Sequence, residues 1–222
     1  MSSSNLVKIS AAGSGKTWDI CHDALESTSS TACKVLITTY TNRGAESIRN
    51  EIRKQNCGVL SSKVIIKTWY EFLLSEMIRP YQTSMSGIKI NEVKSFDFSR
   101  MYGNTNYGKT GTKKRYLTSG HNVGANEASE FVIQLNRMSD GKVIARMEKI
   151  YSKIYFDEIQ DLSGYDIEII NLLLSSSIDV ICCGDNKQAT YSTHNAKKNK
   201  NQTGPNIWFF FERMEKNGLV HS

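Results

Sequence analysis

Short apolar runs alternate along this chain with longer stretches in which apolar residues recur every three or four positions. The short runs have the composition of β-strands and occupy residues 6–9, 34–39, 63–68, 153–156 and 178–183. The longer stretches have helical spacing and occupy residues 17–26, 42–55, 69–78, 163–174 and 206–217. This alternation predicts an α/β fold, with a parallel sheet flanked by helices.

Two of the predicted helices have a clearly defined apolar face. In 17–26, four residues are spaced to cover one face: Trp18, Cys21, Ala24 and Leu25. His22 and Asp23 fall outside this face, so we expect them to meet solvent. In 69–78 the apolar stripe is Trp69, Phe72, Leu73 and Met77, and Pro80 is expected to end the helix.

Residues 79–147 differ in character and predict an inserted subdomain between two parts of one core, 1–78 and 148–222. The first half of the insertion is rich in Gly, Ser, Asn and Thr, and it mixes tyrosines with cations: Tyr102, Tyr107 and Tyr116 with Arg100, Lys109, Lys113, Lys114 and Arg115. Such a mixture suits a single-stranded nucleic acid, because bases stack on rings while cations follow phosphates. A solvated loop explains the same composition.

The second half of the insertion recovers helical spacing and predicts two helices. The first has one apolar face, formed by Ala128, Phe131, Val132 and Leu135. The second has another, formed by Val143, Ile144, Met147 and Ile150.

The charge of the chain bears on its binding partners, and its cysteines bear on the cellular compartment. The formal net charge is +6 with a pI of about 9.0, which favours a polyanionic partner without identifying one. Five cysteines form no C-x-x-C pair, which is typical of reduced, buried thiols in a cytosol-like compartment. No leader-like start and no membrane-length apolar run occur in the sequence, so we expect a cytoplasmic protein with no membrane contact.

A glycine-rich segment joins the first predicted strand to the first helix: Ser10-Ala11-Ala12-Gly13-Ser14-Gly15-Lys16-Thr17. Glycines let successive backbone N–H groups turn inward around an anion, and the helix adds its positive end. This pattern predicts an ATP phosphate site formed by Ala12, Gly13, Ser14, Gly15, Lys16 and Thr17. Lys16 would reach the β- and γ-phosphates and Thr17 would hold Mg²⁺. Ser10 stands where the strict pattern has its first glycine.

An acidic pair, Asp157-Glu158, directly follows the predicted strand 153–156. A carboxylate in this position can hold the Mg²⁺ hydration shell, and its neighbour can orient a water for attack on the γ-phosphate. We therefore assign Asp157 to the metal and Glu158 to the water.

Taken together, these motifs resemble the first RecA-like core domain, a P-loop NTPase fold, of a superfamily 1 helicase of the UvrD/Rep type. The resemblance rests on the phosphate loop and on four further segments: Thr39-Tyr-Thr-Asn-Arg-Gly-Ala45, Thr68-Trp-Tyr-Glu-Phe72, Asp157-Glu-Ile-Gln-Asp-Leu-Ser163 and Gly184-Asp-Asn-Lys-Gln-Ala-Thr-Tyr191. They are similar to the family's T-F-T-N-K-A-A, T-F-H-S-F, D-E-Y-Q-D-L-S and G-D-x-x-Q-x-I-Y.

The resemblance implies residue roles that the pattern alone does not. Single-stranded DNA contacts are implied for Thr39, Tyr40, Thr41, Asn42, Thr68, Trp69, Tyr70 and Tyr191. Gln160 and Gln188 would sense the γ-phosphate and couple it to the DNA site, with Gln188 counted among the catalytic residues. The insertion falls where the family carries its accessory DNA-binding subdomain.

The chain also departs from the family pattern. Residues 192–196 lack the base-stacking ring that follows Tyr191 in the family, and the basic run 197–200 could compensate through phosphate contacts. A second core domain, which in the family supplies arginines to the ATP site, is expected in a longer chain or as a partner. The family's adenine-reading glutamine has no counterpart, since Asn5 is the only amide before the loop. We therefore expect little discrimination between bases.

The sequence thus predicts a Mg²⁺-dependent ATP-hydrolysing core domain of a DNA helicase or single-strand translocase. One alternative is a non-catalytic, nucleotide-gated DNA-binding or regulatory module. Another is a P-loop kinase of a small molecule, which leaves Asp-Glu-Ile-Gln-Asp and Gly-Asp-x-x-Gln unexplained.

Overall fold

The computed structural model describes residues 4–10, 14–30, 32–99, 108–185 and 207–221. The chain divides into two compact units, one made of residues 1–69 with 147–222 and the other of residues 70–146. We call them the sheet unit and the inserted unit.

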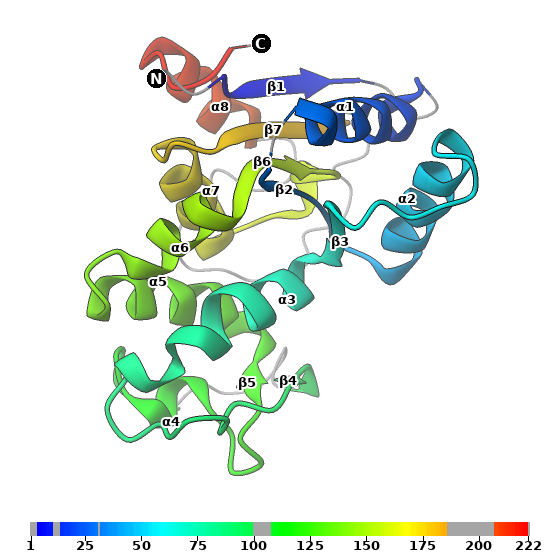
Figure 1. Cartoon of the computed structure of the whole chain (residues 1–222). Helices are drawn as coiled ribbons and strands as arrows, with labels where there is room; N and C mark the ends of the chain where they lie inside the picture. Colours follow the sequence, from blue (N-terminus) through cyan, green and yellow to red (C-terminus); the bar gives the residue numbers. More distant parts are fainter. Residues whose placement is uncertain (1–3, 11–13, 31, 100–107, 186–206, 222) are drawn as a thin grey trace. The chain divides into compact units, whose positions relative to one another are not determined.

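The sheet unit is built on five parallel strands (Figure 1). They are β1 (Leu6–Ile9), β2 (Lys34–Thr39), β3 (Val64–Thr68), β6 (Tyr151–Phe156) and β7 (Asp179–Gly184), in the order β1-β7-β6-β2-β3. The middle strands are buried on both faces, which is why they appear in the sequence as continuous apolar runs. This arrangement confirms the predicted α/β class with a parallel sheet.

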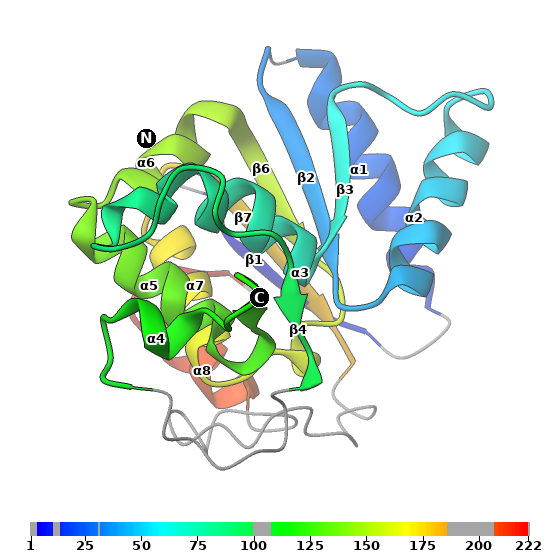
Figure 2. The same ribbon diagram turned by 90° about the horizontal axis from the view of Figure 1, so that it is seen from below.

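Helices cover both sides of this sheet. They are α1 (Lys16–Ser30), α2 (Asn42–Gln55), α7 (Tyr165–Leu174) and α8 (Ile207–Lys216). Figure 2 shows α1 and α2 on one side and α7 on the other. In the part of the chain that the structure describes, no helix combines the length and apolarity needed to cross a membrane.

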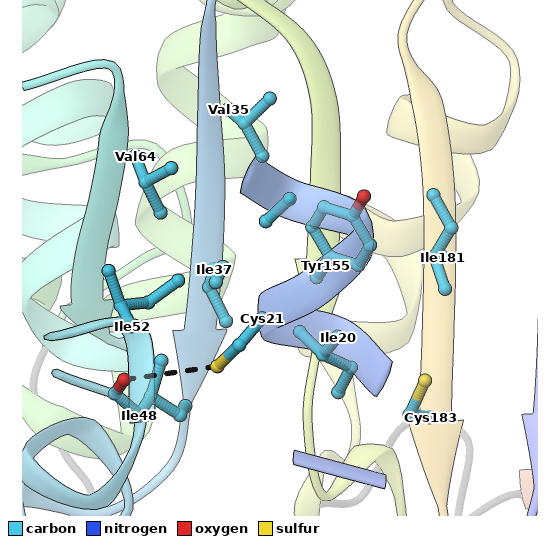
Figure 3. Close-up of a cluster of buried hydrophobic side chains, with 11 residues drawn as sticks. Ile20, Cys21, Val35, Ile37, Ile48, Ile52, Val64, Tyr155, Ile181 and Cys183 are labelled. Carbon is cyan, nitrogen blue, oxygen red and sulfur yellow. Dashed lines mark hydrogen bonds between the residues drawn. The ribbon is translucent and has the colours of Figure 1, made fainter. Parts of the chain in front are cut away.

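The core on the α1 and α2 side is one cluster of buried side chains (Figure 3). Helix α1 contributes Ile20, Cys21 and Ala24, and α2 contributes Ile48 and Ile52. The strands contribute Val35, Ile37, Val64, Tyr155, Ile181 and Cys183. This packing fixes the start of α1, and with it the phosphate loop, against the sheet.

The predicted face of α1 is wrong at two positions. Trp18 is 49% exposed and stacks on His22, with ring centroids 4.8 Å apart. Asp23 does not simply meet solvent, because it accepts a hydrogen bond of 2.6 Å from the hydroxyl of Tyr155 and lies 3.4 Å from Lys153 Nζ. A buried phenol needs such a partner, so the sheet recruits a polar residue from the helix above it.

The cysteine prediction holds for three thiols of five. Cys21, Cys182 and Cys183 are buried, whereas Cys33 is partly exposed and Cys57 exposed. Cys57 has a φ of 52° in the turn after α2, where the chain leaves the core.

The inserted unit is mainly helical. It contains the end of α3 (Trp69–Phe72), β4 (Phe96–Asp97), α4 (Lys113–Tyr116), β5 (Val123–Gly124), α5 (Ala128–Met138) and the start of α6 (Lys142–Ile150). The two helices predicted in its second half are therefore confirmed. The helix predicted over 69–78 does end at Ile78, although only Trp69–Phe72 is α-helical and Leu73–Ile78 is a π-helix. A 3-10 helix over Arg79–Ser84 follows directly and has Pro80 in its first turn. Proline is tolerated there because first-turn N–H groups need no helical partner.

Part of the tyrosine and cation mixture in this unit is structural. Tyr116 is fully buried, stacks on Phe131 at 4.8 Å, and donates a 3.0 Å hydrogen bond to Glu130. Arg115 pairs with the same carboxylate at 2.8 Å, and Lys113 pairs with Glu92. The suggestion that Tyr116 stacks on a nucleic acid base is therefore wrong. Arg100, Tyr102 and Tyr107 lie outside the described residues.

One buried amide ties the edge of the sheet to the end of the chain. Asn5 donates from Nδ2 to the carbonyls of Leu174 and Leu219, both at 2.8 Å, and accepts from the Val180 N–H at 3.0 Å. Its side chain is therefore committed to the fold, and it is no candidate for reading a nucleotide base.

Replacing Asn5 with alanine would leave two carbonyls and one N–H without these partners. Since each buried polar group left unpaired costs about 1–3 kcal/mol, we expect Asn5→Ala to lower the free energy of unfolding by about 3 kcal/mol or more. Urea denaturation measures the change. Asn217→Ala, at an exposed position, is the matched control, and an equal effect of the two substitutions would contradict this role for Asn5.

Candidate functional site

The carboxyl ends of the parallel strands bring the predicted phosphate and acid residues to one edge of the sheet. The loop after β1 is anchored there, since the Ser10 N–H donates to the Gly184 carbonyl at the end of β7 at 3.0 Å. The chain after β6 is anchored in the same way, by the Asp157 N–H on the Thr38 carbonyl at 2.9 Å. Ligands of open α/β sheets bind at this edge.

The described part of the phosphate loop has the features that the sequence predicts. Gly15 has a φ of +89°, a conformation that favours glycine, and a side chain there would meet only open space. Lys16 begins α1, and its Nζ donates to the Ser10 carbonyl at 3.2 Å. An ammonium group has three donors, so this bond leaves capacity for an anion. Ala12 and Gly13 lie outside the described residues, while Ser14 is exposed and Thr17 partly exposed.

Asp157 is the most perturbed acid at this edge. Burial, followed by the charge of Glu158, raises the pKa of Asp157 to about 6, while the charge of Lys16 opposes the shift. Its Oδ1 atom is buried and has no hydrogen-bond partner among the described residues. A buried carboxylate oxygen without a partner is costly, and a hard cation such as Mg²⁺ is a ligand that would compensate it.

Glu158 is linked to the end of β7 through Gln160. The Gln160 amide donates to Glu158 Oε2, and Gln160 Oε1 accepts from the Asp185 N–H at 3.2 Å. Gly184 permits this approach, because a Cβ there would lie 2.6 Å from Gln160 Oε1. Glu158 itself has φ 57° and ψ 49°, a left-handed conformation that non-glycine residues adopt rarely and often at functional sites.

A small pocket opens between the ends of β2, β3 and β6. Its lining combines residues predicted to touch DNA with the two acids: Thr38, Thr39, Tyr40, Trp69, Phe156, Asp157, Glu158 and Leu162. The structure thus brings Thr39, Tyr40 and Trp69 to the same pocket as Asp157 and Glu158. Residues predicted to contact DNA and residues predicted to serve the nucleotide therefore line one pocket.

Other predicted DNA contacts have structural roles or lie elsewhere. Thr41 caps α2, since its side chain accepts from the Gly44 N–H at 3.0 Å, and the exposed Asn42 begins that helix. Trp69 is 2% exposed and donates from Nε1 to Asp166 at 3.1 Å, so its ring is not open to a base. Thr68 is buried.

Three further predicted site residues do not belong to the described part of this edge. Tyr70 belongs to the inserted unit rather than to the sheet unit. Gln188 and Tyr191 lie outside the described residues.

Sequence reasoning missed Thr38 as part of the site. This residue lines the pocket, and its buried hydroxyl has no hydrogen-bond partner among the described residues. Its carbonyl also holds the Asp157 backbone. The available signal was its place one residue before the end of a buried strand, where side chains alternate between the two faces of the sheet.

Comparison with protein families decides the classification. A family model for the UvrD/REP helicase N-terminal domain matches residues 73–203, more than half of the 222 residues. The chain belongs to this family. The matched span of this UvrD/REP helicase N-terminal domain contains Asp157 and Glu158, while the phosphate loop precedes it. No curated protein matches the chain.

This classification agrees with the fold, which is that of a RecA-like P-loop NTPase. A phosphate loop after the first strand and an acidic pair after an inner strand are the features that this fold uses to hold a nucleotide. The helicase-type core anticipated from the sequence is therefore confirmed.

The raised pKa of Asp157 predicts a pH-dependent stability. Its ordinary value is 3.8 and its folded value about 6, so the folded state favours the protonated acid. The free energy of unfolding is therefore highest, as far as Asp157 is concerned, below about pH 4, and it falls as the pH rises through 6. The loss amounts to about 3 kcal/mol, from roughly 1.4 kcal/mol per pKa unit.

We therefore expect Asp157→Asn to stabilise the UvrD/REP helicase N-terminal domain by up to about 3 kcal/mol at about pH 8 in a metal chelator, and to change little near pH 4. Urea denaturation at the two pH values measures this difference. Asp140→Asn, in an exposed turn, should have a small effect at both. A gain for Asp157→Asn that is the same at both pH values would contradict the assignment.

Proposed function

We propose that the chain binds ATP with Mg²⁺ and hydrolyses it as the motor core of a single-strand DNA translocase or helicase. The observation that carries this proposal is the shared pocket, where Asp157 and Glu158 meet Thr39 and Tyr40. Membership of the UvrD/REP family supports the helicase part. The phosphate loop and the perturbed Asp157 support the nucleotide part.

In this proposal, ATP phosphates occupy the loop from Ala12 to Thr17, with Lys16 against the β- and γ-phosphates. Thr17 would hold Mg²⁺ and Asp157 its hydration shell, and the partnerless Oδ1 of Asp157 fits a site that takes a hydrated cation. When bound, Mg²⁺ neutralises charge that develops on the phosphates.

Glu158 orients the attacking water and accepts its proton. Gln160 positions Glu158, because one end of its amide holds the carboxylate and the other is held by the Asp185 N–H. The resemblance to the family also assigns Gln188 a role at the γ-phosphate. Positioning matters because a misplacement of about 1 Å can cost roughly a hundredfold in rate.

Single-stranded DNA runs over the ends of β2 and β3, where Tyr40 is partly exposed and Asn42 exposed. Thr39 and Thr68 are buried at these strand ends, and Thr41 caps the neighbouring helix. The resemblance to the family adds Tyr191 to the proposed DNA contacts. Residues 79–147 act as the accessory DNA-binding subdomain of the motor. A second core domain, in the same chain or in a partner, contributes arginines to the ATP site.

The direct test is ATP turnover by the purified chain with Mg²⁺, in the presence and absence of single-stranded DNA. We expect turnover that requires Mg²⁺ and that rises with DNA. A small-molecule kinase would show no response to DNA, and a non-catalytic module would show no turnover in either condition. Either outcome would refute the proposed function.

Lys16→Ala should weaken the binding of Mg²⁺-ATP. A hydrogen bond to a charged group is worth about 1.5–3 kcal/mol, so the dissociation constant should rise by about tenfold to a hundredfold. Isothermal titration calorimetry measures it. Lys34→Ala, at the exposed start of β2, is the control and should bind normally. Unchanged affinity in Lys16→Ala would remove the loop from the ATP site.

Gln160→Ala should lower kcat by about tenfold to a hundredfold with little change in KM, because Glu158 loses its positioning partner while the phosphate contacts remain. Gly184→Ala should act in the same direction, since its Cβ would displace Gln160 Oε1. Gly120→Ala is the matched control, because its Cβ meets its nearest neighbour only at 3.6 Å. A rise in KM at constant kcat would show that Gln160 binds nucleotide instead.

A further inference from the structure

Three aromatic side chains of the inserted unit meet at its surface. The ring centroid of Tyr70 lies 5.1 Å from that of Phe96 and 5.1 Å from that of Phe98, and the two phenylalanines are 6.2 Å apart. Phe98 is 52% exposed, and the other two rings are partly exposed. We call these three residues the aromatic surface.

A short parallel ladder presents this surface to solvent. Strand β4 pairs with β5 (Figure 1). Two backbone hydrogen bonds join the residues just before β4 to the same segment: the Lys94 N–H donates to the His121 carbonyl at 3.1 Å, and the Val123 N–H donates to the Ser95 carbonyl at 2.8 Å. Lys94 precedes Phe96 by two residues, and its backbone is held next to β5 by the bond to His121. Lys94 is exposed.

The chain is also held directly beyond Phe98. The carboxylate of Asp97 accepts from the Ser99 N–H at 3.0 Å and from the Ser99 hydroxyl at 2.5 Å. Phe98 is therefore flanked by a strand on one side and by a fixed turn on the other. Its exposure follows from the local backbone, so little ordering is needed before a ligand can use the ring.

A cluster of one exposed and two partly exposed rings is less common on a protein surface than a single exposed ring. Single exposed apolar residues are common, but contiguous ones mark binding sites, because each Å² of apolar surface left in water costs about 25 cal/mol. Phe209 of α8 is a single exposed ring in the sheet unit, 62% exposed, so it serves as the comparison for Phe98. The aromatic surface thus calls for a ligand with flat, apolar faces.

The charge of the unit indicates which ligand. Residues 70–146 contain eleven Lys and Arg against seven Asp and Glu, a net charge of +4. Three of these cations, Lys113, Arg115 and Arg146, are paired with carboxylates inside the unit, whereas Lys94 is exposed two residues before Phe96. Flat faces joined by phosphates describe single-stranded DNA.

We propose that the aromatic surface is a base-stacking site for single-stranded DNA, with Lys94 on a neighbouring phosphate. This inference rests on the proposed function for its partner, and it adds a site that the sequence motifs do not contain beyond Tyr70. Stacking is tolerant of sequence because every base has a π-face. The site therefore holds the strand without reading it.

The test uses the whole chain and two fluorescent probes of about 20 nucleotides, an oligothymidylate and an abasic strand with the same backbone. Loss of one stacked base costs about 1–3 kcal/mol, so Phe98→Ala should weaken oligothymidylate binding by about fivefold to a hundredfold. Binding of the abasic strand should not change. Phe98→Leu should behave like Phe98→Ala, since leucine keeps apolar area without a ring. Phe209→Ala is the control and should bind both probes normally.

Lys94→Gln should act differently from the ring variants. It should weaken both probes and reduce the slope of log K against log salt by about 0.7, the value for one contact to a single-strand phosphate. Anisotropy titrations at several salt concentrations measure this slope. An unchanged slope would remove Lys94 from the site.

Three outcomes would overturn the inference in different ways. If Phe98→Ala binds oligothymidylate as tightly as the unaltered chain, the surface serves something else, such as a protein, while the proposed function stands. If Phe98→Leu binds normally, the contact is apolar without stacking. If the unaltered chain binds neither probe, the DNA part of the proposed function fails together with this site.

Discussion

The arrangement at the carboxyl edge of the sheet depends on one electrostatic constraint, the buried carboxylate of Asp157. The fold places it at the end of an inner strand, fixes its backbone on Thr38, and leaves one oxygen without a partner among the described residues. Such a group destabilises the protein unless a cation compensates it. Local instability of this kind is a common feature of sites that bind ligands, because a site optimised for the folded protein alone would fill that position with an apolar side chain.

Around this carboxylate, backbone bonds make neighbouring strand ends dependent on one another. Ser10 is held by the end of β7, and the Gln160 amide connects Glu158 to Asp185 beyond that same strand. Gly184 keeps the connection short, since no side chain intervenes. The phosphate loop, the acid pair and the segment after β7 therefore share one set of contacts. The side chain of Glu158 is positioned through Gln160 by the end of β7.

Sequence patterns predicted the strands and helices well because burial on both sheet faces and on one helix face leaves clear periodicities. They misplaced Trp18 because a tryptophan at a core-like spacing can also turn outward and stack on a neighbouring ring, here His22 one turn later. They misjudged Tyr116 because a phenol that satisfies its hydroxyl on Glu130 is as well suited to a core as to a surface. The pocket that joins Thr39 and Tyr40 to the acids depends on the strand order, which no local pattern contains.

We propose that one edge of the sheet serves both nucleotide and DNA. Thermodynamic linkage between the two ligands tests this proposal most directly. The affinity of the chain for a non-hydrolysable ATP analogue with Mg²⁺ is measured with and without a saturating DNA single strand, and the affinity for the strand is then measured with and without the analogue. Coupling of typical size, about 1–3 kcal/mol, should change both affinities by the same factor of about 5 to 150. Two affinities that are each independent of the other ligand would contradict the account.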